Sequence, residues 1–389
     1  MRECKKIKLG ELYEVHNGLS KGKQFFGSGY PFLTFSNVFN NWFLPNELTS
    51  LVQSSEKERE TCSIKKGDVF ITRTSETMDE LGMSSVALKD YPNATYNGFT
   101  KRLRPLTDKV IPEYIGYYLR SQKFRGKFMA FSTMTTRASL ANDDLLSMEV
   151  EIPDKVVQRH IATILYRYDS LIENYQKQIK LLEEAAQRLY KEWFVDLRFP
   201  GHENTKIIDG VPEGWEKKPV DTIYSIKYGK NLSTKLISEN GKFPVYGANG
   251  VIGYYDKANY NEQVVLITSR GNGSGDVLMT YHKDAFITNN SFIVLPIEDY
   301  SYCQLPFTYQ FLKNANFRAV RTGAAQPQLT NQSIHTVDVV LPSKDVIIDY
   351  CDKASYNNKK IILLKNQIRL LTEARDRLLP KLMSEEIEV

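Results

Sequence analysis

The chain has 389 residues, of which 42% are hydrophobic and 25% charged, and its net charge is only +5. This composition is typical of a soluble globular protein with two or three domains. No apolar run approaches the roughly 18 residues of a membrane span, and the charged residues 1–6 have no signal-peptide pattern, so we expect no membrane association.

The four cysteines and five histidines give no sign of a disulfide framework or a metal site. Cys4, Cys62, Cys303 and Cys351 are scattered, and no pair has C-x-x-C spacing. This usage predicts reduced thiols in a cytoplasmic protein. The histidines are far apart in sequence and lack the spacing of metal ligands, so we expect no metal in this chain.

Two globular segments, residues 1–153 and 200–342, have the strand and turn patterns of mixed α/β domains. Each is predicted to contain a buried strand, a helix that begins near a proline, and a short closing strand. The matching pairs are 65–72 with 263–268, 112–119 with 305–312, and 150–153 with 339–342.

Each globular segment is followed by a predicted long helix, in residues 154–199 and 343–389. Apolar residues in these segments recur at alternating steps of four and three, which indicates a heptad seam of a coiled coil. Asp154 and Ser343 are predicted N-caps, and Pro380 is predicted to end the second helix near Leu379. The seam residues are Ile161, Leu165, Ile172, Ile179, Leu182 and Leu189 in the first helix, and Ile361, Leu364, Ile368, Leu371 and Leu378 in the second.

Two polar residues, Asn357 and Arg375, interrupt the second seam. They could fix the register of the helix pair at some expense in packing, or they could lie at the edge of the apolar stripe. The sequence leaves these two interpretations equally open.

The chain is an internal duplication. The stretch 152–156 aligns with 341–345, and 181–189 aligns with 370–378, both at an offset of 189 residues without a gap. At the front of the two copies, 12–18 aligns with 223–229 at an offset of 211, so the first copy is 22 residues longer. We therefore predict an α+β fold, in which two mixed α/β domains are separated by two long helices. The helices are expected to pair as an antiparallel coiled coil, with a pseudo-two-fold relation between the copies.

The sequence contains no recognisable catalytic motif. The glycine-rich stretches 25–29 and 271–275 do not open helices, and neither a P-loop nor a Pro-Pro-aromatic motif of adenine methyltransferases occurs. An E-x-K triplet at 216–218 is better explained by chance. The sequence therefore predicts a chain without a catalytic constellation.

Residues suited to binding nucleic acid are more evident in the sequence than catalytic residues. Residues 101–137 contain nine basic and two acidic residues, and we favour contact of a basic helix face, formed by Arg120, Lys123 and Lys127, with DNA phosphates. The alternative is a solvated helix face. For the aromatic residues interleaved there, a place in the core is the better interpretation.

Polar loops recur at matched places in the two copies. Arg, Gln, Asn and Thr are the side chains that read base edges, and differing side chains at matched positions suit two half-sites of different sequence. Solvated loops are the alternative for any one of them. In the first copy the candidate DNA-binding residues are Lys21, Lys23, Thr72, Arg73, Thr74, Thr133, Thr135, Thr136 and Arg137. In the second copy they are Lys230, Asn249, Ser269, Arg270, Asn272, Arg321, Thr322 and Gln326.

This arrangement resembles the specificity subunit of type I restriction–modification systems. The resemblance covers essentially the whole chain, and its most specific parts are the helical repeats that begin at 152–161 and 341–343, together with 243–255 and 322–329. It implies that two target-recognition domains (1–153 and 200–342) each read half of a split double-stranded DNA site. It also implies that the helices (154–199 and 343–389) act as a spacer and dock two methyltransferase subunits, which restriction subunits join. S-adenosylmethionine, ATP and Mg²⁺ would then be bound by partner subunits and not by this chain.

The first copy departs from this pattern. It lacks the Tyr-Gly-Ala-Asn-Gly stretch of 246–250, and residues 32–38 stand where a comparable strand and turn are expected. We interpret the chain as a non-catalytic DNA-recognition subunit. The alternatives are a coiled-coil scaffold without DNA specificity and a self-contained DNA methyltransferase or nuclease.

Overall fold

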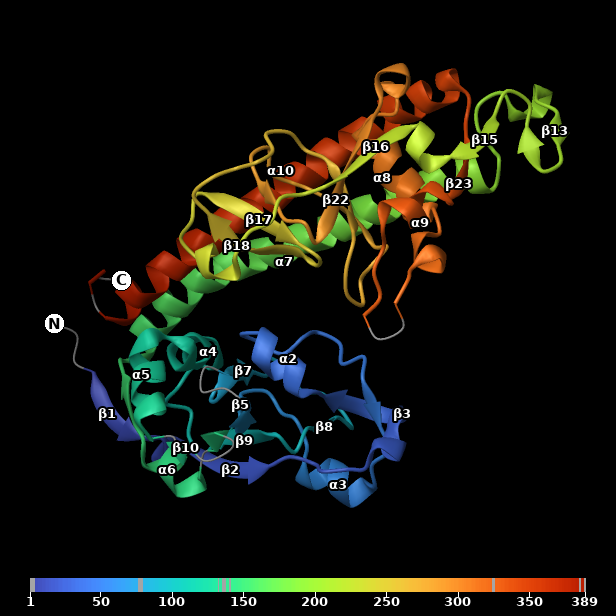
Figure 1. The fold of residues 1–389 in the computed structure, drawn as a ribbon. Helices are drawn as coiled ribbons and strands as arrows, with labels where there is room; N and C mark the ends of the chain where they lie inside the picture. Colours follow the sequence, from blue (N-terminus) through green and yellow to red (C-terminus); the bar gives the residue numbers. More distant parts are fainter. Residues whose placement is uncertain are drawn as a thin grey trace. The chain divides into compact units, whose positions relative to one another are not determined.

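The computed structural model describes residues 4–75, 80–131, 133–134, 138–139, 141–323, 326–384 and 386–387. Its contacts divide the chain into two compact units (Figure 1). Unit 1 comprises Met1–Ile172 with Leu370–Val389, and unit 2 comprises Glu173–Arg369. The division falls within the two long helical segments, because residues of both helices enter the core of each unit.

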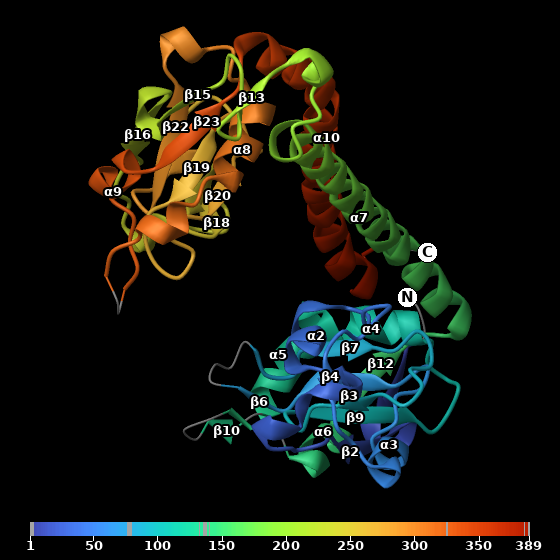
Figure 2. The ribbon, with the colours of Figure 1, turned by 90° about the vertical axis from the view of Figure 1, so that its right-hand side faces the viewer.

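The largest sheet of unit 1 has four antiparallel strands (Figure 2). The strands of this unit are β1 (Lys5–Lys8), β2 (Tyr13–Asn17), β3 (Phe26–Leu33), β4 (Leu51–Val52), β5 (Val69–Thr72), β6 (Thr74–Ser75), β7 (Ser84–Val86), β8 (Thr95–Tyr96), β9 (Thr100–Pro105), β10 (Thr133–Met134), β11 (Ala138–Ser139) and β12 (Glu149–Ile152). The four-stranded sheet has the order β2-β9-β5-β7. A second sheet has the order β4-β3-β8 with β3 and β8 parallel, and β1 pairs with β12.

Unit 2 repeats the topology of the two main sheets and of the β1–β12 pair. Its strands are β13 (Ile207–Ile208), β14 (Val211–Pro212), β15 (Glu216–Pro219), β16 (Tyr224–Tyr228), β17 (Phe243–Gly247), β18 (Gly250–Tyr255), β19 (Val265–Thr268), β20 (Val277–Met279), β21 (Phe286–Ile287), β22 (Ser291–Pro296) and β23 (Asp338–Leu341). The four-stranded sheet has the order β16-β22-β19-β20. The order β18-β17-β21 again has a parallel pair, and β15 pairs with β23. The predicted duplication and α+β fold are confirmed.

Short helices cover these sheets. They are α1 (Leu9–Leu12), α2 (Phe35–Asn40), α3 (Glu56–Thr61), α4 (Pro112–Arg120), α5 (Gln122–Phe131) and α6 (Asn142–Ser147) in unit 1, and α8 (Leu305–Asn314) and α9 (Asn331–His335) in unit 2. Both α4 and α8 begin with a proline in the first turn, as predicted, because that position needs no backbone N–H. The aromatic residues Tyr114, Tyr117 and Tyr118 of α4 and Phe124 and Phe128 of α5 are buried in the core of unit 1.

The two copies differ where the first lacks the glycine-containing turn. In unit 2 the strand β17 turns directly into β18, and Gly250 has a φ of +98°, which favours glycine. In unit 1 the expected strand is present as β3, but the expected turn is replaced by helix α2. Thr34 caps that helix by accepting a hydrogen bond from the Asn37 N–H at 3.1 Å.

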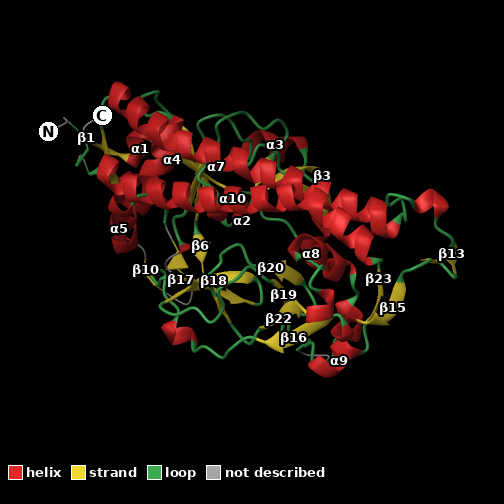
Figure 3. Ribbon diagram, turned by 90° about the horizontal axis from the view of Figure 1, so that it is seen from above, coloured by secondary structure: helices red, strands yellow, loops and turns green. Residues whose placement is uncertain are grey.

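The long helices are α7 (Lys155–Tyr190), which continues as a π-helical turn over Lys191–Val195, and α10 (Lys344–Met383) (Figure 3). Asp154 caps α7 as predicted, since its carboxylate accepts the N–H groups of Val156 and Val157. Residues of both helices share one apolar cluster in each unit. In unit 1, the beginning of α7 meets the end of α10, and in unit 2, the end of α7 meets the earlier part of α10.

The predicted seam is confirmed by its burial. Six of its residues are buried, namely Ile161, Leu165, Ile172, Ile179, Ile361 and Leu364. The other five are half-buried, namely Leu182, Leu189, Ile368, Leu371 and Leu378. Within each unit, the pairing is antiparallel.

The prediction that Pro380 ends the second helix near Leu379 is wrong. Helix α10 continues to Met383, and the N–H of Ser384 bonds the Pro380 carbonyl at 2.8 Å. A proline so close to a helix end removes few backbone hydrogen bonds. Burial of Leu379, Leu382 and Met383 in the core of unit 1 offsets that loss.

Arg375 lies within the seam and not at its edge. Its side chain is buried and forms an ion pair with Asp169 of α7, which also accepts a hydrogen bond from the Tyr117 hydroxyl. The guanidinium lies 5.1 Å from the centre of the Trp42 ring. This buried network favours the interpretation that Arg375 fixes the register of the helices.

Candidate nucleic-acid interface

Three segments of unit 2 meet at one end of its main sheet. The turn after β19 contacts the loop before α9 through the Gly271 N–H, which bonds the Pro327 carbonyl at 2.9 Å, and through a bridge between Arg270 and Gln328. The β17–β18 turn is attached by the Thr268 hydroxyl, which donates to the Ala248 carbonyl at 2.7 Å. Residues distant in sequence are therefore held together by backbone contacts.

This surface presents polar and basic side chains. We define the loop surface of unit 2 as Lys230, Asn249, Arg270, Asn272, Arg321, Thr322 and Gln326, of which all but the half-buried Arg321 are exposed. The Arg321 Nε donates to the Arg318 carbonyl at 3.0 Å, which restricts its guanidinium. Lys230 is placed by the N–H of Asn289, which bonds the Lys230 carbonyl at 3.0 Å. The set is rich in the donors and acceptors that match base edges and phosphates.

Ser269 does not belong to this surface. Its side chain is fully buried, and its hydroxyl donates to the Asn289 carbonyl at 3.1 Å. Thr72, at the equivalent end of β5 in unit 1, is likewise buried. Its hydroxyl donates to the Glu80 carbonyl at 2.7 Å and accepts the Met83 N–H at 2.9 Å. Both side chains hold loops in place and are inaccessible to a ligand in this structure.

The loop arrangement recurs in unit 1 at the offset of 189 residues. Strands β10 and β11 pair Thr133 with Ser139, as Thr322 pairs with Gln328 in unit 2. Strand β6 then pairs Thr74 with Ser139, as Arg270 pairs with Gln328. Over the described residues, the backbone pairs at the ends of the two predicted loops therefore match. Thr135, Thr136 and Arg137 lie outside the described residues.

Arg73, Lys21 and Lys23 are further candidate DNA-binding residues of unit 1. Arg73 is half-buried, and its Nη1 donates to the Asn17 Oδ1 at 3.4 Å. Lys23 is exposed, whereas Lys21 forms an ion pair with Glu58 at 2.8 Å. The hydrogen bond from Lys21 lowers the pKa of the Glu58 carboxyl.

Most of the described basic residues in 101–137 form contacts within unit 1, and the contact of this segment with DNA phosphates stays a prediction. Lys101 and Arg102 are 4% exposed, and burial lowers the pKa of Lys101. Arg104 is paired with Asp68 at 2.7 Å. Arg120 is half-buried and donates to the carbonyls at the end of α2, and desolvation lowers its pKa to about 10. Local charge density in the sequence did not reveal these partners.

Lys123 and Lys127 share one carboxylate. Their Nζ atoms lie 2.5 and 3.0 Å from the two oxygens of Glu151 on β12. Hydrogen bonds from Lys123 and then Lys127 lower the pKa of Glu151 to about 2. Lys123 also lines a small crevice with Pro153 and Leu382, at the beginning of α7 and the end of α10. The contact of these two lysines with DNA phosphates stays a prediction.

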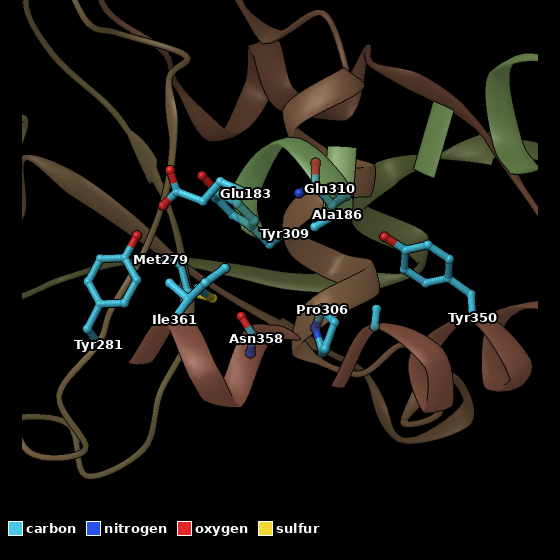
Figure 4. A pocket seen from close by; sticks show the side chains of 11 residues that line it. Glu183, Ala186, Met279, Tyr281, Pro306, Tyr309, Gln310, Tyr350, Asn358 and Ile361 are labelled. Atoms are coloured by element: carbon cyan, nitrogen blue, oxygen red, sulfur yellow. The ribbon is translucent and has the colours of Figure 1, made fainter. Parts of the chain in front are cut away.

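A small cavity in unit 2 contains no catalytic constellation (Figure 4). Its volume is about 30 Å³, enough for one or two water molecules. Two buried polar atoms among its lining residues, the Gln310 Oε1 and the Tyr350 hydroxyl, have no hydrogen-bond partner. Over the described residues, we find no cluster of three or more His, Cys, Asp or Glu side chains suited to a metal, and no helix long and apolar enough to cross a membrane.

The fold and loops define a class of protein with two copies of one recognition domain, each joined to a long helix. Comparison with known proteins identifies that class. The family model for the type I restriction modification DNA specificity domain matches residues 1–184 and 212–366. The chain therefore belongs to the type I restriction–modification specificity-subunit family, whose function is DNA sequence recognition.

Individual relatives agree over the whole length. The type I restriction enzyme MjaIX specificity subunit of Methanocaldococcus jannaschii is 26% identical over 100% of this chain and 94% of its own. The HindI specificity subunit of Haemophilus influenzae is 23% identical and matches 100% of both chains. The crystal structure of the S subunit of a type I restriction–modification system from M. genitalium has the same fold. It has a TM-score of 0.59 and 18% identity over 98% of this chain and 96% of that one.

Proposed function

We propose that the chain reads a bipartite double-stranded DNA target, with unit 1 on one half-site and unit 2 on the other, and that it contributes no catalytic step. The observation that carries this proposal is the recurrence of one loop arrangement in both units. The pair Thr133–Ser139 in unit 1 matches the pair Thr322–Gln328 in unit 2, whereas the residue types at several matched positions differ, as with Ser139 and Gln328 or Thr74 and Arg270. Equal scaffolds with unequal side chains suit two half-sites of different sequence.

Binding of designed duplexes tests this proposal. The chain, in the presence of its methyltransferase subunit, is expected to bind a duplex carrying the split target more tightly than a scrambled duplex of equal length, by about 10³-fold or more at physiological salt. Equal affinities would favour a scaffold without DNA specificity. Methylation or cleavage of DNA by the purified chain alone would favour a self-contained enzyme.

The helix pair is proposed to dock two methyltransferase subunits, with restriction subunits joining the full complex. Leu181 on α7 and Leu370 on α10 occupy the same repeat position and are 65% and 54% exposed. Leu181 lines a surface groove of about 340 Å³ with Ala185 and Leu189. One exposed apolar site per repeat suits two copies of one partner better than a single large partner.

Replacing these leucines by aspartate is expected to remove the partner one copy at a time. Leu181→Asp and Leu370→Asp should each leave one methyltransferase subunit in the co-purified complex, and the double variant none, as measured by native mass spectrometry. Leu363→Asp is the matched control, because Leu363 is 50% exposed but its repeat counterpart is Asn174. Retention of two partner copies by the double variant would contradict the proposed docking site.

A further inference from the structure

Phe99 is an exposed aromatic residue on a rigid turn between β8 and β9. Its N–H donates to the Asn97 Oδ1 at 2.7 Å, and the Thr100 N–H donates to the Asn97 carbonyl at 3.0 Å. The Phe99 carbonyl accepts the N–H of Arg73 at 3.0 Å. The backbone at Phe99 is therefore fixed next to a candidate DNA-binding residue.

The ring of Phe99 is 56% exposed, more than any other aromatic side chain described in unit 1. A single exposed apolar side chain is common on protein surfaces, so what distinguishes Phe99 is the hydrogen bond that fixes its backbone to Arg73, a candidate DNA-binding residue. The N–H of the preceding residue, Gly98, donates to the Leu19 carbonyl at 2.9 Å. The segment that follows Leu19 contains Lys21 and Lys23. The backbone at Phe99 thus lies between Arg73 and the segment that precedes Lys21 and Lys23.

The equivalent position in unit 2 is Asn290. The same turn is present there, since the Ser291 N–H bonds the Thr288 carbonyl at 3.2 Å and the Ser269 N–H bonds the Asn290 carbonyl at 2.8 Å. Ser269 takes the place of Arg73 in this pairing. One structural position therefore carries an aromatic ring in one unit and an amide in the other.

We propose that Phe99 is a specificity-determining residue that packs its ring against a base of the first half-site, at the position where unit 2 presents Asn290. This inference rests on the proposed function. An aromatic ring contacts a base either through the methyl group of thymine or by stacking on a base that has left the duplex stack. Both contacts are apolar, and both require the exposed, fixed ring that the β8–β9 turn provides.

The test compares Phe99→Ala with Leu106→Ala in the full chain with its methyltransferase subunit. Leu106 is 57% exposed and directly follows β9, whereas Phe99 directly precedes that strand, so it is a matched apolar control. Phe99→Ala is expected to weaken binding to the target duplex about 10-fold or more, with Leu106→Ala and the thermal unfolding midpoints unchanged. Phe99→Tyr, which keeps the ring, should retain most of the affinity.

Two duplex probes identify the kind of contact. Replacing thymine by uracil in the first half-site should weaken wild-type binding, but not binding by Phe99→Ala, if the ring contacts a methyl group. A rise in 2-aminopurine fluorescence that depends on Phe99 indicates an unstacked base instead. The inference is overturned if wild type prefers the target duplex and Phe99→Ala binds it equally well. If wild type itself shows no preference, the proposed function has failed and not this inference alone.

Discussion

Replacing Arg375 by alanine is expected to lower the free energy of unfolding by about 3–5 kcal/mol. Arg375 and Asp169 have side chains only 11% and 17% exposed, so the variant would leave the Asp169 carboxylate buried without its cation. The Tyr117 hydroxyl that remains on Asp169 supplies a hydrogen bond but no charge. Urea unfolding followed by tryptophan fluorescence measures this loss, and Trp42 beside Arg375 is a local reporter.

A matched control is available on the same helix. Arg377 pairs with Glu373 one turn away at 2.6 Å, and its side chain is 79% exposed. Arg377→Ala should therefore change stability by less than about 0.5 kcal/mol. Replacing Arg375 by methionine together with Asp169 by leucine should recover most of the stability, because neither charge is then left buried. Equal losses for Arg375→Ala and Arg377→Ala would contradict the assignment of a buried, register-setting ion pair.

Arg270→Ala is expected to weaken binding to the target duplex by about 10- to 100-fold, the loss typical of one bidentate contact between arginine and guanine. Arg270 is exposed on the loop surface of unit 2, and its backbone is held by the bridge to Gln328. Fluorescence anisotropy at fixed salt, with target and scrambled duplexes, measures the change. The loss should be much smaller on scrambled DNA.

Arg377→Ala is again the control, because it removes the same charge from an exposed arginine on the helix surface. If Arg270→Ala lowers the affinity equally for target and scrambled duplexes, Arg270 contacts a phosphate. If it lowers the affinity for neither duplex, Arg270 lies outside the interface.

The elements that the sequence predicted best are those set by local pattern. The heptad spacing from Ile161 onward and the 189-residue offset gave the helix pair and the repeated topology, because burial on one helix face repeats every three or four residues. The prolines of α4 and α8 marked helix starts for a local reason as well. The fixed φ of proline and its missing N–H suit the first turn of a helix, independently of tertiary contacts.

The predictions that were wrong depended on tertiary contacts. Pro380 did not end α10, because buried residues on both sides of it hold the last turn. The contacts of the basic residues in 101–137 were likewise not predicted, because their partners are distant in sequence. Asp68, Glu151 and the carbonyls at the end of α2 approach these cations only in the folded unit. Phe99 was missed for the same reason, since only the structure shows its exposure beside Arg73.

The central claim, that each unit reads one half of a split DNA site, is tested most directly by mapping methylated bases in cells. Cells that contain the methyltransferase subunit would receive either the wild-type chain or a variant with Arg270, Asn272 and Gln326 replaced by alanine. We predict one split motif with the wild-type chain, no methylation without it, and relaxed sequence at one half-site only with the variant. An unchanged motif with the variant, or methylation that does not depend on this chain, would contradict the account.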